Sequence, residues 1–274
     1  MRRYIAIACC IITVGCASKE EPVIDQSSQS QVVEKYLKNG AWNHHYLTKE
    51  WDEWISKGIE EDSTIAFLWQ QKALPFWKRK KYALAVKYYD KAVELNRHKW
   101  LSRRGFLRCI FSKEYEGALS DLEAYRNEFG PTYEQDHPLE FYMGICHLQL
   151  NRFDKALEVL QGSVQAQESE YGLEGVHYLD RYYLAIAYYE NGQYDQAIAE
   201  FDKTLEEYPV FSDAQYYKSL SLNYLGDKES AQSLMAEAKA NFDAGHTFNE
   251  DSNPYEDYPY QITWQWSSAE AMLR

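Results

Sequence analysis

Residues that make tight turns or covalent staples are scarce in this sequence. Its 274 residues include only 7 prolines, 13 glycines and 5 cysteines, and no CxxC pair occurs. So few turn formers argue against a sandwich or barrel of many short strands, and so few cysteines exclude a disulfide framework. Cys109 and Cys146, which lie in apolar helical stretches, are therefore predicted to be buried free thiols.

Motifs that carry enzymatic chemistry are also missing. The chain has no GxSxG, SxxK or papain-like cysteine signature, and no glycine-rich phosphate loop. The adjacent His44 and His45 lack further nearby ligands, so we expect solvated or stacked rings there. The other histidines lie on scattered elements. The sequence therefore predicts a protein without catalytic residues, metal site or cofactor.

Positive charge is in short supply overall. Asp and Glu total 42 against 29 Lys and Arg, a formal net charge of −13, which argues against a protein built around nucleic acid. Aromatic residues, by contrast, are abundant, because 24 Tyr, 11 Phe and 8 Trp make up 16% of the chain. Together with a hydrophobic content of 45%, they supply enough apolar area for a folded core.

The N-terminus has the features of a secretion signal. Arg2 and Arg3 precede an apolar stretch, residues 4–14, that is too short to cross a bilayer. The stretch ends at Thr13-Val14-Gly15-Cys16, which resembles a bacterial lipobox. The resemblance implies that residues 1–15 are a lipoprotein signal peptide and that Cys16 is the lipid attachment site. The alternative is a soluble secreted protein cut at a nearby small residue.

This interpretation predicts where in the cell the protein lies. Residues 16–30 are polar and rich in Ser and Gln, and are predicted to form a disordered tether. Several acyl chains on Cys16 give stable anchoring. We therefore expect a lipid-anchored protein of the bacterial outer membrane, on its periplasmic face or at the cell surface. Lys19-Glu20-Glu21 is similar to the short signal that sends some lipoproteins to the surface.

Five segments share one pattern, a small residue in a first helix and an alanine 12 residues later in a second helix, or 13 in the second segment. A large apolar residue follows each alanine by four positions. Small side chains let two antiparallel helices approach closely, and large ones interdigitate around the contact. The small pairs are Ala73/Ala85, Gly105/Ala118, Gly144/Ala156, Ala185/Ala197 and Ser219/Ala231, and the large residues are Tyr89, Leu122, Leu160, Phe201 and Met235.

This pattern resembles the tetratricopeptide repeat, whose period is about 34 residues. The resemblance implies an all-α fold, an α-α superhelix (TPR solenoid) of about five helix hairpins over residues 65–243. An N-terminal helical hairpin is expected over residues 31–64. A loop and a capping helix are expected over residues 244–274, where Ile262, Trp266, Ala269 and Leu273 form one apolar face.

Three places depart from a regular repeat. Residues 130–138 are expected to form an ordered loop, and residues 164–175 a lengthened helix or a loop. Pro75 lies inside a predicted first helix, where its missing N–H is expected to kink that helix.

In this family the first helices line a concave groove, and ligands lie across them. The resemblance therefore implies a partner-binding surface of aromatic side chains, about half of which are expected to belong to the core instead. The Lys/Asn clamp of chaperone-binding members has no counterpart, because Gln70 and Leu74 stand in its place. The candidate groove residues are Phe67, Trp77, Phe106, Phe141, Tyr142, Tyr182, Tyr183, Tyr189, Tyr216 and Tyr217.

Charge is distributed unevenly along the chain. Residues 65–113 carry a net charge of +11, between net charges of −5 over residues 16–64 and −21 over residues 114–274. Such a basic segment either is a solvated surface beside acidic repeats or binds an anionic partner surface or lipid headgroups. The predicted basic patch consists of Lys78, Arg79, Lys80, Lys81, Arg103 and Arg104.

These features together predict a membrane-anchored interaction scaffold in the bacterial cell envelope, with a protein or peptide as its partner. Two alternatives remain open besides an enzyme. One is a surface lipoprotein that captures glycans, since Tyr and Trp also stack on sugars. The other is an outer-membrane barrel-assembly lipoprotein, which this chain resembles in length, anchor and number of repeats.

Overall fold

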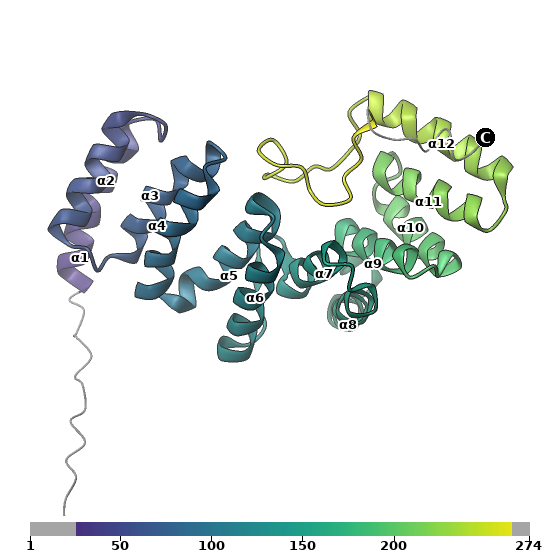
Figure 1. Cartoon of the computed structure of the whole chain (residues 1–274), viewed down its shortest axis with the longest axis horizontal. Coiled ribbons are helices and arrows are strands. Elements are labelled where there is room, and N and C mark those ends of the chain that lie inside the picture. The colour runs from purple at the N-terminus through teal and green to yellow at the C-terminus, as the bar shows by residue number, and fades with distance from the viewer. Residues whose placement is uncertain (1–25, 265–274) are drawn as a thin grey trace, which may run out of the picture.

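The computed structural model describes residues 26–264 as a curved array of helix hairpins (Figure 1). The signal peptide of residues 1–15, Cys16 and most of the predicted tether lie outside the described residues, as does the greater part of the predicted capping helix, residues 265–274. Within the described part, the fold is the predicted all-α superhelix of stacked hairpins.

The N-terminal unit is an irregular helical hairpin. Helix α1 (Gln26–Val33) continues as the π-helical turn η1 (Glu34–Lys38), and the 3-10 turn η2 (Ala41–Asn43) leads into α2 (Lys49–Glu61). Because α1 begins at Gln26, residues 26–30 are helical and do not belong to a disordered tether, which corrects that part of the prediction. Leu37 and Ile55 are fully buried between this unit and the first repeat.

Five antiparallel hairpins follow, each made of a first and a second helix. They stack in chain order, so that each hairpin packs on the next and hides a face that one hairpin alone could not bury. Their helices are α3 (Ala66–Lys78) with α4 (Tyr82–Leu95), α5 (Arg97–Leu107) with α6 (Tyr115–Phe129), α7 (Leu139–Gln149) with α8 (Phe153–Tyr171), α9 (Tyr178–Glu190) with α10 (Tyr194–Glu207), and α11 (Ser212–Tyr224) with α12 (Lys228–Asp243).

The predicted small residues lie where the two helices of each hairpin cross. All ten of them are buried, and so are the five large residues that follow the alanines. At the two glycines the helices approach so closely that no side chain would fit. A Cβ atom added to Gly144 would lie 2.3 Å from Leu160, and one added to Gly105 would lie 2.7 Å from Leu122. The spacing pattern therefore identified the helix contacts correctly.

The turn inside each hairpin contains one residue with positive φ, always five positions before the alanine of the second helix. Asn, Gly and, at two turns, Lys occupy this left-handed position: Lys80, Lys113, Asn151, Gly192 and Gly226. In the second hairpin the extra residue is absorbed by a π-helical turn, η3 (Arg108–Ser112), at the end of α5. The register of that turn relative to Ala118 is thereby preserved.

Each of the three places that depart from a regular repeat has its own local structure. Residues 130–138 are ordered and contain a short antiparallel pair, β1 (Tyr133–Glu134) with β2 (His137–Pro138). Helix α8 is lengthened to 19 residues and is followed by the 3-10 turn η4 (Leu173–Gly175). Helix α3 continues through Pro75. Because proline has no N–H, it cannot donate a hydrogen bond to the Gln71 carbonyl one turn earlier. The Trp51 indole N–H lies 3.5 Å from that carbonyl instead.

Two further observations concern the thiols and the membrane. Cys109 and Cys146 are buried free thiols, as predicted, and burial raises the pKa of the Cys146 thiol well above its usual range.

None of the helices between Gln26 and Asp243 combines the length and the apolar composition that a bilayer crossing requires.

After α12 the chain turns back along the inner side of the curved array (yellow in Figure 1) instead of only covering the last hairpin. Residues 246–262, which we call the strap, consist of turns and irregular backbone. Ile262, expected on the apolar face of a capping helix, is buried here in irregular backbone.

Candidate interaction groove

The groove is the inner face of the hairpin array, and the strap occupies much of it. One end of the strap is fixed at α11. The Ser212 N–H donates to the His246 carbonyl at 2.9 Å. The Asp213 carboxylate accepts from the Thr247 hydroxyl at 2.7 Å and from the Ile262 N–H at 2.7 Å. Asp213 therefore holds both ends of the strap.

Residues near both ends of the strap lie against α9. The hydroxyl of Tyr182 donates to the Tyr260 carbonyl at 2.8 Å, and that of Tyr183 donates to the Pro259 carbonyl at 2.6 Å. Phe248 and Tyr258 stack on each other with ring centroids 5.6 Å apart, and both are buried. Phe248 also packs edge-on against Tyr182 at 5.5 Å. The strap thus completes an aromatic core that the hairpins alone leave open.

The far side of the strap reaches the first two hairpins. Glu256 lies 3.2 Å from the Lys80 ammonium and accepts a hydrogen bond from Tyr82. The Lys78 ammonium sits 3.2 Å from the centroid of the Tyr255 ring, a cation–π geometry. Lys113 donates to the Asp257 carbonyl at 2.6 Å. A carboxylate, an aromatic ring and a backbone carbonyl of the strap therefore meet basic groups at the end of α3 and in the turns after α3 and α5.

The ten predicted groove residues divide into two groups. Trp77, Phe106, Phe141, Tyr142, Tyr182 and Tyr183 are buried, in line with the expectation that about half of the set belongs to the core. Tyr182 and Tyr183 nevertheless keep their hydroxyls on the inner face, beneath the strap. The half-buried members of the set are Phe67, Tyr189, Tyr216 and Tyr217.

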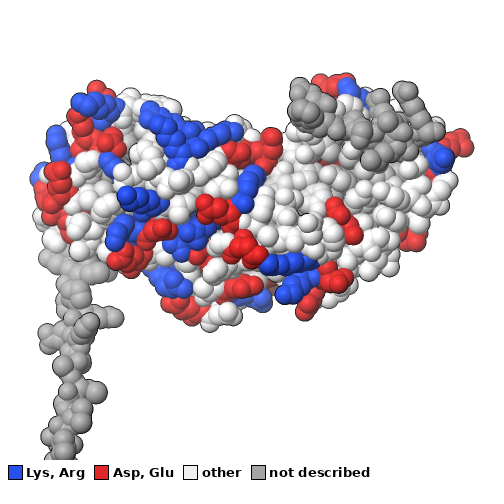
Figure 2. All heavy atoms as spheres, viewed as in Figure 1, with Lys and Arg blue, Asp and Glu red and all other residues white. Residues whose placement is uncertain are grey.

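The six residues of the predicted basic patch do not form one free surface. Arg104 makes two hydrogen bonds to Asp121, at 2.6 and 2.8 Å, and a third to Asp90 at 2.7 Å. Arg103 pairs with Glu134 at 3.0 Å. On the face shown in Figure 2, Lys and Arg gather over the N-terminal hairpins but are interspersed with carboxylates, while the later hairpins are largely uncharged.

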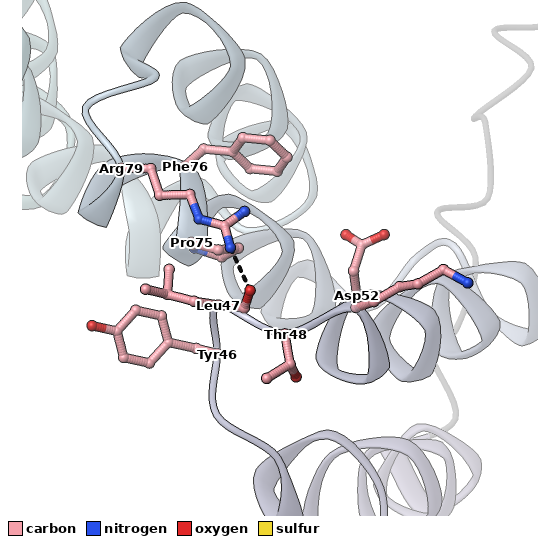
Figure 3. A pocket seen from close by; sticks show the side chains of 8 residues that line it. Tyr46, Leu47, Thr48, Asp52, Pro75, Phe76 and Arg79 are labelled. Atoms are coloured by element: carbon pink, nitrogen blue, oxygen red, sulfur yellow. Dashed lines mark hydrogen bonds between the residues drawn. The ribbon is translucent and has the colours of Figure 1, made fainter.

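The four basic residues of the first turn also separate. Lys78 and Lys80 face the strap, as described above. Arg79 points instead to the N-terminal unit, where its guanidinium donates to the Leu47 carbonyl (Figure 3). Lys81 is exposed. The strap and the N-terminal unit thus occupy three of the four side chains.

A buried histidine lies where the strap crosses the third and fourth hairpins. His137 has no exposed surface, and its Nδ1 lies 2.8 Å from Asp180 while its Nε2 lies 3.8 Å from Glu250 of the strap. Burial by itself lowers the pKa of His137, but the hydrogen bond to Asp180 and the negative charges of Asp180 and Glu250 raise it to about 9. The imidazolium form therefore links the strap to α9.

Among the described residues, one group of three potential metal ligands lies at the same place. His137, His177 and Glu250 each offer a ligand atom, and these atoms lie within 4.8 Å of one another. Sequence spacing could not find this group, because its members come from β2, the N-cap of α9 and the strap. The adjacent pair His44 and His45 stays apart from it, and His45 stacks on Tyr46 at 4.4 Å.

Two hollows adjoin these surfaces. One of about 380 Å³ lies on the inner face of the first two hairpins, next to the strap. Gln70 and Leu74, the residues that replace the Lys/Asn clamp, lie in its wall with Lys78 and Arg103, and Asp251 and Ser252 of the strap close one side. The other, of about 350 Å³, lies between Tyr46–Lys49, Asp52 and the end of α3 (Figure 3).

Comparison with known proteins agrees with this geometry. The family model described as tetratricopeptide repeat matches residues 182–246, and a second model of the same description matches residues 68–99. RNA polymerase II-associated protein 3 from Xenopus laevis is 25% identical over 174 residues, which is 60% of this chain and 26% of that protein. The chain therefore spans about a quarter of the length of this curated relative.

Several solved structures share the hairpin array. PilW, a widely conserved type IV pilus biogenesis factor, is 18% identical with a TM-score of 0.59, covering 79% of this chain and 93% of PilW. A tetratricopeptide repeat protein from Parabacteroides merdae is 16% identical with a TM-score of 0.59, covering 78% and 80%. YrrB, a TPR protein with an unusual peptide-binding site, is 22% identical with a TM-score of 0.51, covering 68% and 91%.

At these identities the structural likeness concerns the fold alone. The matched segments fall on the first hairpin and on the last two hairpins. The chain is therefore an all-α solenoid in which residues 68–99 and 182–246 match the tetratricopeptide repeat.

Proposed function

We propose that this protein is a membrane-anchored scaffold of the bacterial cell envelope that binds a protein partner in its concave groove. The observation that carries the proposal is the strap. A non-helical peptide segment already lies in the groove, held by side-chain donors on its carbonyl groups and by pockets for its aromatic rings. A surface that holds one such segment has the chemistry to hold another.

Two of the similar structures support this choice. YrrB has an unusual peptide-binding site, and PilW is a type IV pilus biogenesis factor, so a solenoid of this shape binds a peptide in at least one other protein. Stacking on sugars requires exposed ring faces, whereas six of the ten candidate aromatic side chains are buried. A peptide is therefore favoured over a glycan, and we propose no catalytic role.

The anchor in this proposal is Cys16, lipidated after removal of residues 1–15. Nine residues, 17–25, lie between it and the start of α1, a reach of roughly 30–35 Å when extended. That length lets the groove face partners a few nanometres from an outer-membrane leaflet, on the periplasmic side or at the cell surface.

Anchoring and binding are tested together. Cys16→Ser is expected to abolish lipidation and to move the protein from the membrane fraction to the soluble fraction, because no other described segment can cross a bilayer. Crosslinking and pull-down of the parent from its own membranes then identifies the partner, with the serine variant as the control. Retention of that variant in the detergent phase would refute the anchor. Co-purification with an outer-membrane barrel would favour the barrel-assembly alternative.

A further inference from the structure

We propose that the strap is an internal copy of the groove's ligand. The groove then binds in trans a short non-helical segment in which tyrosines are flanked by prolines and acidic residues, and that segment must displace the strap. This inference rests on the proposed function and specifies its partner by chemistry.

The first argument is the way in which the strap is held. Three side chains of the hairpins donate to its carbonyl groups, Tyr182, Tyr183 and Lys113. Carbonyl groups are present in every peptide, so these contacts recognise a backbone path and not one sequence. Backbone hydrogen bonds between strap residues are confined to local turns, such as the bond from the Tyr255 N–H to the Ser252 carbonyl. The strap therefore owes its position to the groove.

The second argument is the set of side-chain sites along the path. Phe248 and Tyr258 fill an aromatic site beside Tyr182 and Tyr183. Tyr255 lies against the Lys78 ammonium, and Glu256 meets both Lys80 and Tyr82. Aromatic and carboxylate groups thus occupy separate, spaced positions. These positions define what a competing segment must carry.

Charge supplies the third argument. The strap contains Glu250, Asp251, Glu256 and Asp257 and no Lys or Arg. Its far side lies on the part of the chain with a net charge of +11. Electrostatic complementarity of this kind raises the association rate and selects acidic partners. A basic or neutral segment would lose these contacts.

The fourth argument concerns access. The hollow of about 380 Å³ adjoins the strap at Asp251 and Ser252 and opens the groove over the first two hairpins. An incoming segment can therefore contact the inner face before the strap leaves. Since the strap must still open, the apparent affinity of a ligand is reduced by the fraction of molecules in which the groove is free.

The experiment uses the full chain and a fluorescent synthetic peptide of residues 246–262. Phe248→Ser with Tyr258→Ser removes the buried rings of the strap without touching the groove, and Asn249→Ala, at an exposed strap position, is the matched control. The double variant is expected to bind the peptide at least about tenfold more tightly than the parent or the control. A peptide with its four acidic residues changed to amides is expected to bind more weakly, most clearly at low salt.

Equal peptide affinity for the parent and the double variant would overturn the inference, and so would the absence of binding to both. If the double variant does not fold, as judged by circular dichroism, Glu256→Lys frees the far side of the strap and takes its place. A strap-exchanged dimer of the parent in light scattering would assign the groove to a second copy and would likewise overturn the inference. The peptide-binding assay uses purified protein and tests the strap alone. Failure of the proposed function would be seen separately, in the membrane pull-down.

Discussion

Asp213 is the residue on which the strap depends most directly. Its carboxylate is buried and accepts three hydrogen bonds, from Ile262 N–H and the hydroxyls of Thr247 and Ser212. These bonds favour the ionised form, but burial outweighs them and raises the pKa of Asp213 from 3.8 to about 6. A single side chain thus couples the closure of the strap to pH.

The sign of that coupling gives a prediction. Because the folded pKa lies above the unfolded one, the folded protein binds the proton more tightly. The stability that Asp213 contributes is therefore present below about pH 4 and is lost as pH rises through about 6. Relative to Asp213→Asn, the parent is expected to lose about 2–3 kcal/mol of unfolding free energy across this window. Urea unfolding at several pH values measures it, and parallel profiles for the two proteins would contradict it.

The hairpin is the element that the small residues control. Gly144→Ala places a Cβ 2.3 Å from Leu160 in the partner helix, and relieving that overlap is expected to cost about 1–3 kcal/mol of unfolding free energy. Gly162→Ala, in the second helix of the same hairpin, is the matched control, because a Cβ there meets nothing within 4 Å. That change is expected to stabilise the protein by about 0.5–1 kcal/mol. Thermal or urea unfolding of both variants measures the contrast, and equal shifts would show that the helix crossing is misplaced.

The strap as an element is tested by its charged contact. Lys80→Glu places a negative charge beside Glu256, whereas Lys81→Glu makes the same change at the exposed neighbouring position. The first variant is expected to weaken closure by about 0.5–1 kcal/mol, a typical size for an exposed ion pair. Amide hydrogen exchange over residues 250–258 should then accelerate, and high salt should reduce the difference. Equal exchange in the two variants would mean that the contact does not hold the strap.

At the scale of the whole molecule, the strap joins hairpins that are not neighbours. The two helices of a hairpin and adjacent hairpins pack on each other, as in any solenoid. The strap instead contacts Lys80 and Tyr82 of the first hairpin and Asp213 of the fifth. It therefore acts as a brace across the curve that Figure 1 displays.

Release of this brace is expected to open the curve. The Phe248→Ser, Tyr258→Ser variant should show a larger radius of gyration than the parent in small-angle X-ray scattering, with unchanged helix content in the far ultraviolet. Asn249→Ala should scatter like the parent. An identical radius for the double variant would show that hairpin packing alone sets the curvature.

What the sequence determined by itself is the set of hairpins. Ala197 and Phe201 are informative because their contacts lie about a dozen residues away, within one hairpin, and a short spacing rule describes such contacts completely. The extra residue before Ala118 could be counted from the sequence, although only the structure revealed the π-helical turn that absorbs it.

What only the tertiary structure decided is the occupation of the groove. The contacts of Glu256 with Tyr82 and of Tyr260 with Tyr182 join residues 174 and 78 positions apart, and no periodicity in the chain predicts such pairs. The same holds for His137, which meets Asp180 and Glu250 only when three elements converge. The strap has no repeating pattern of its own, because its position is set by the pockets and charges of the solenoid. Local spacing therefore determined the helices, and long-range complementarity decided which of their aromatic faces are covered.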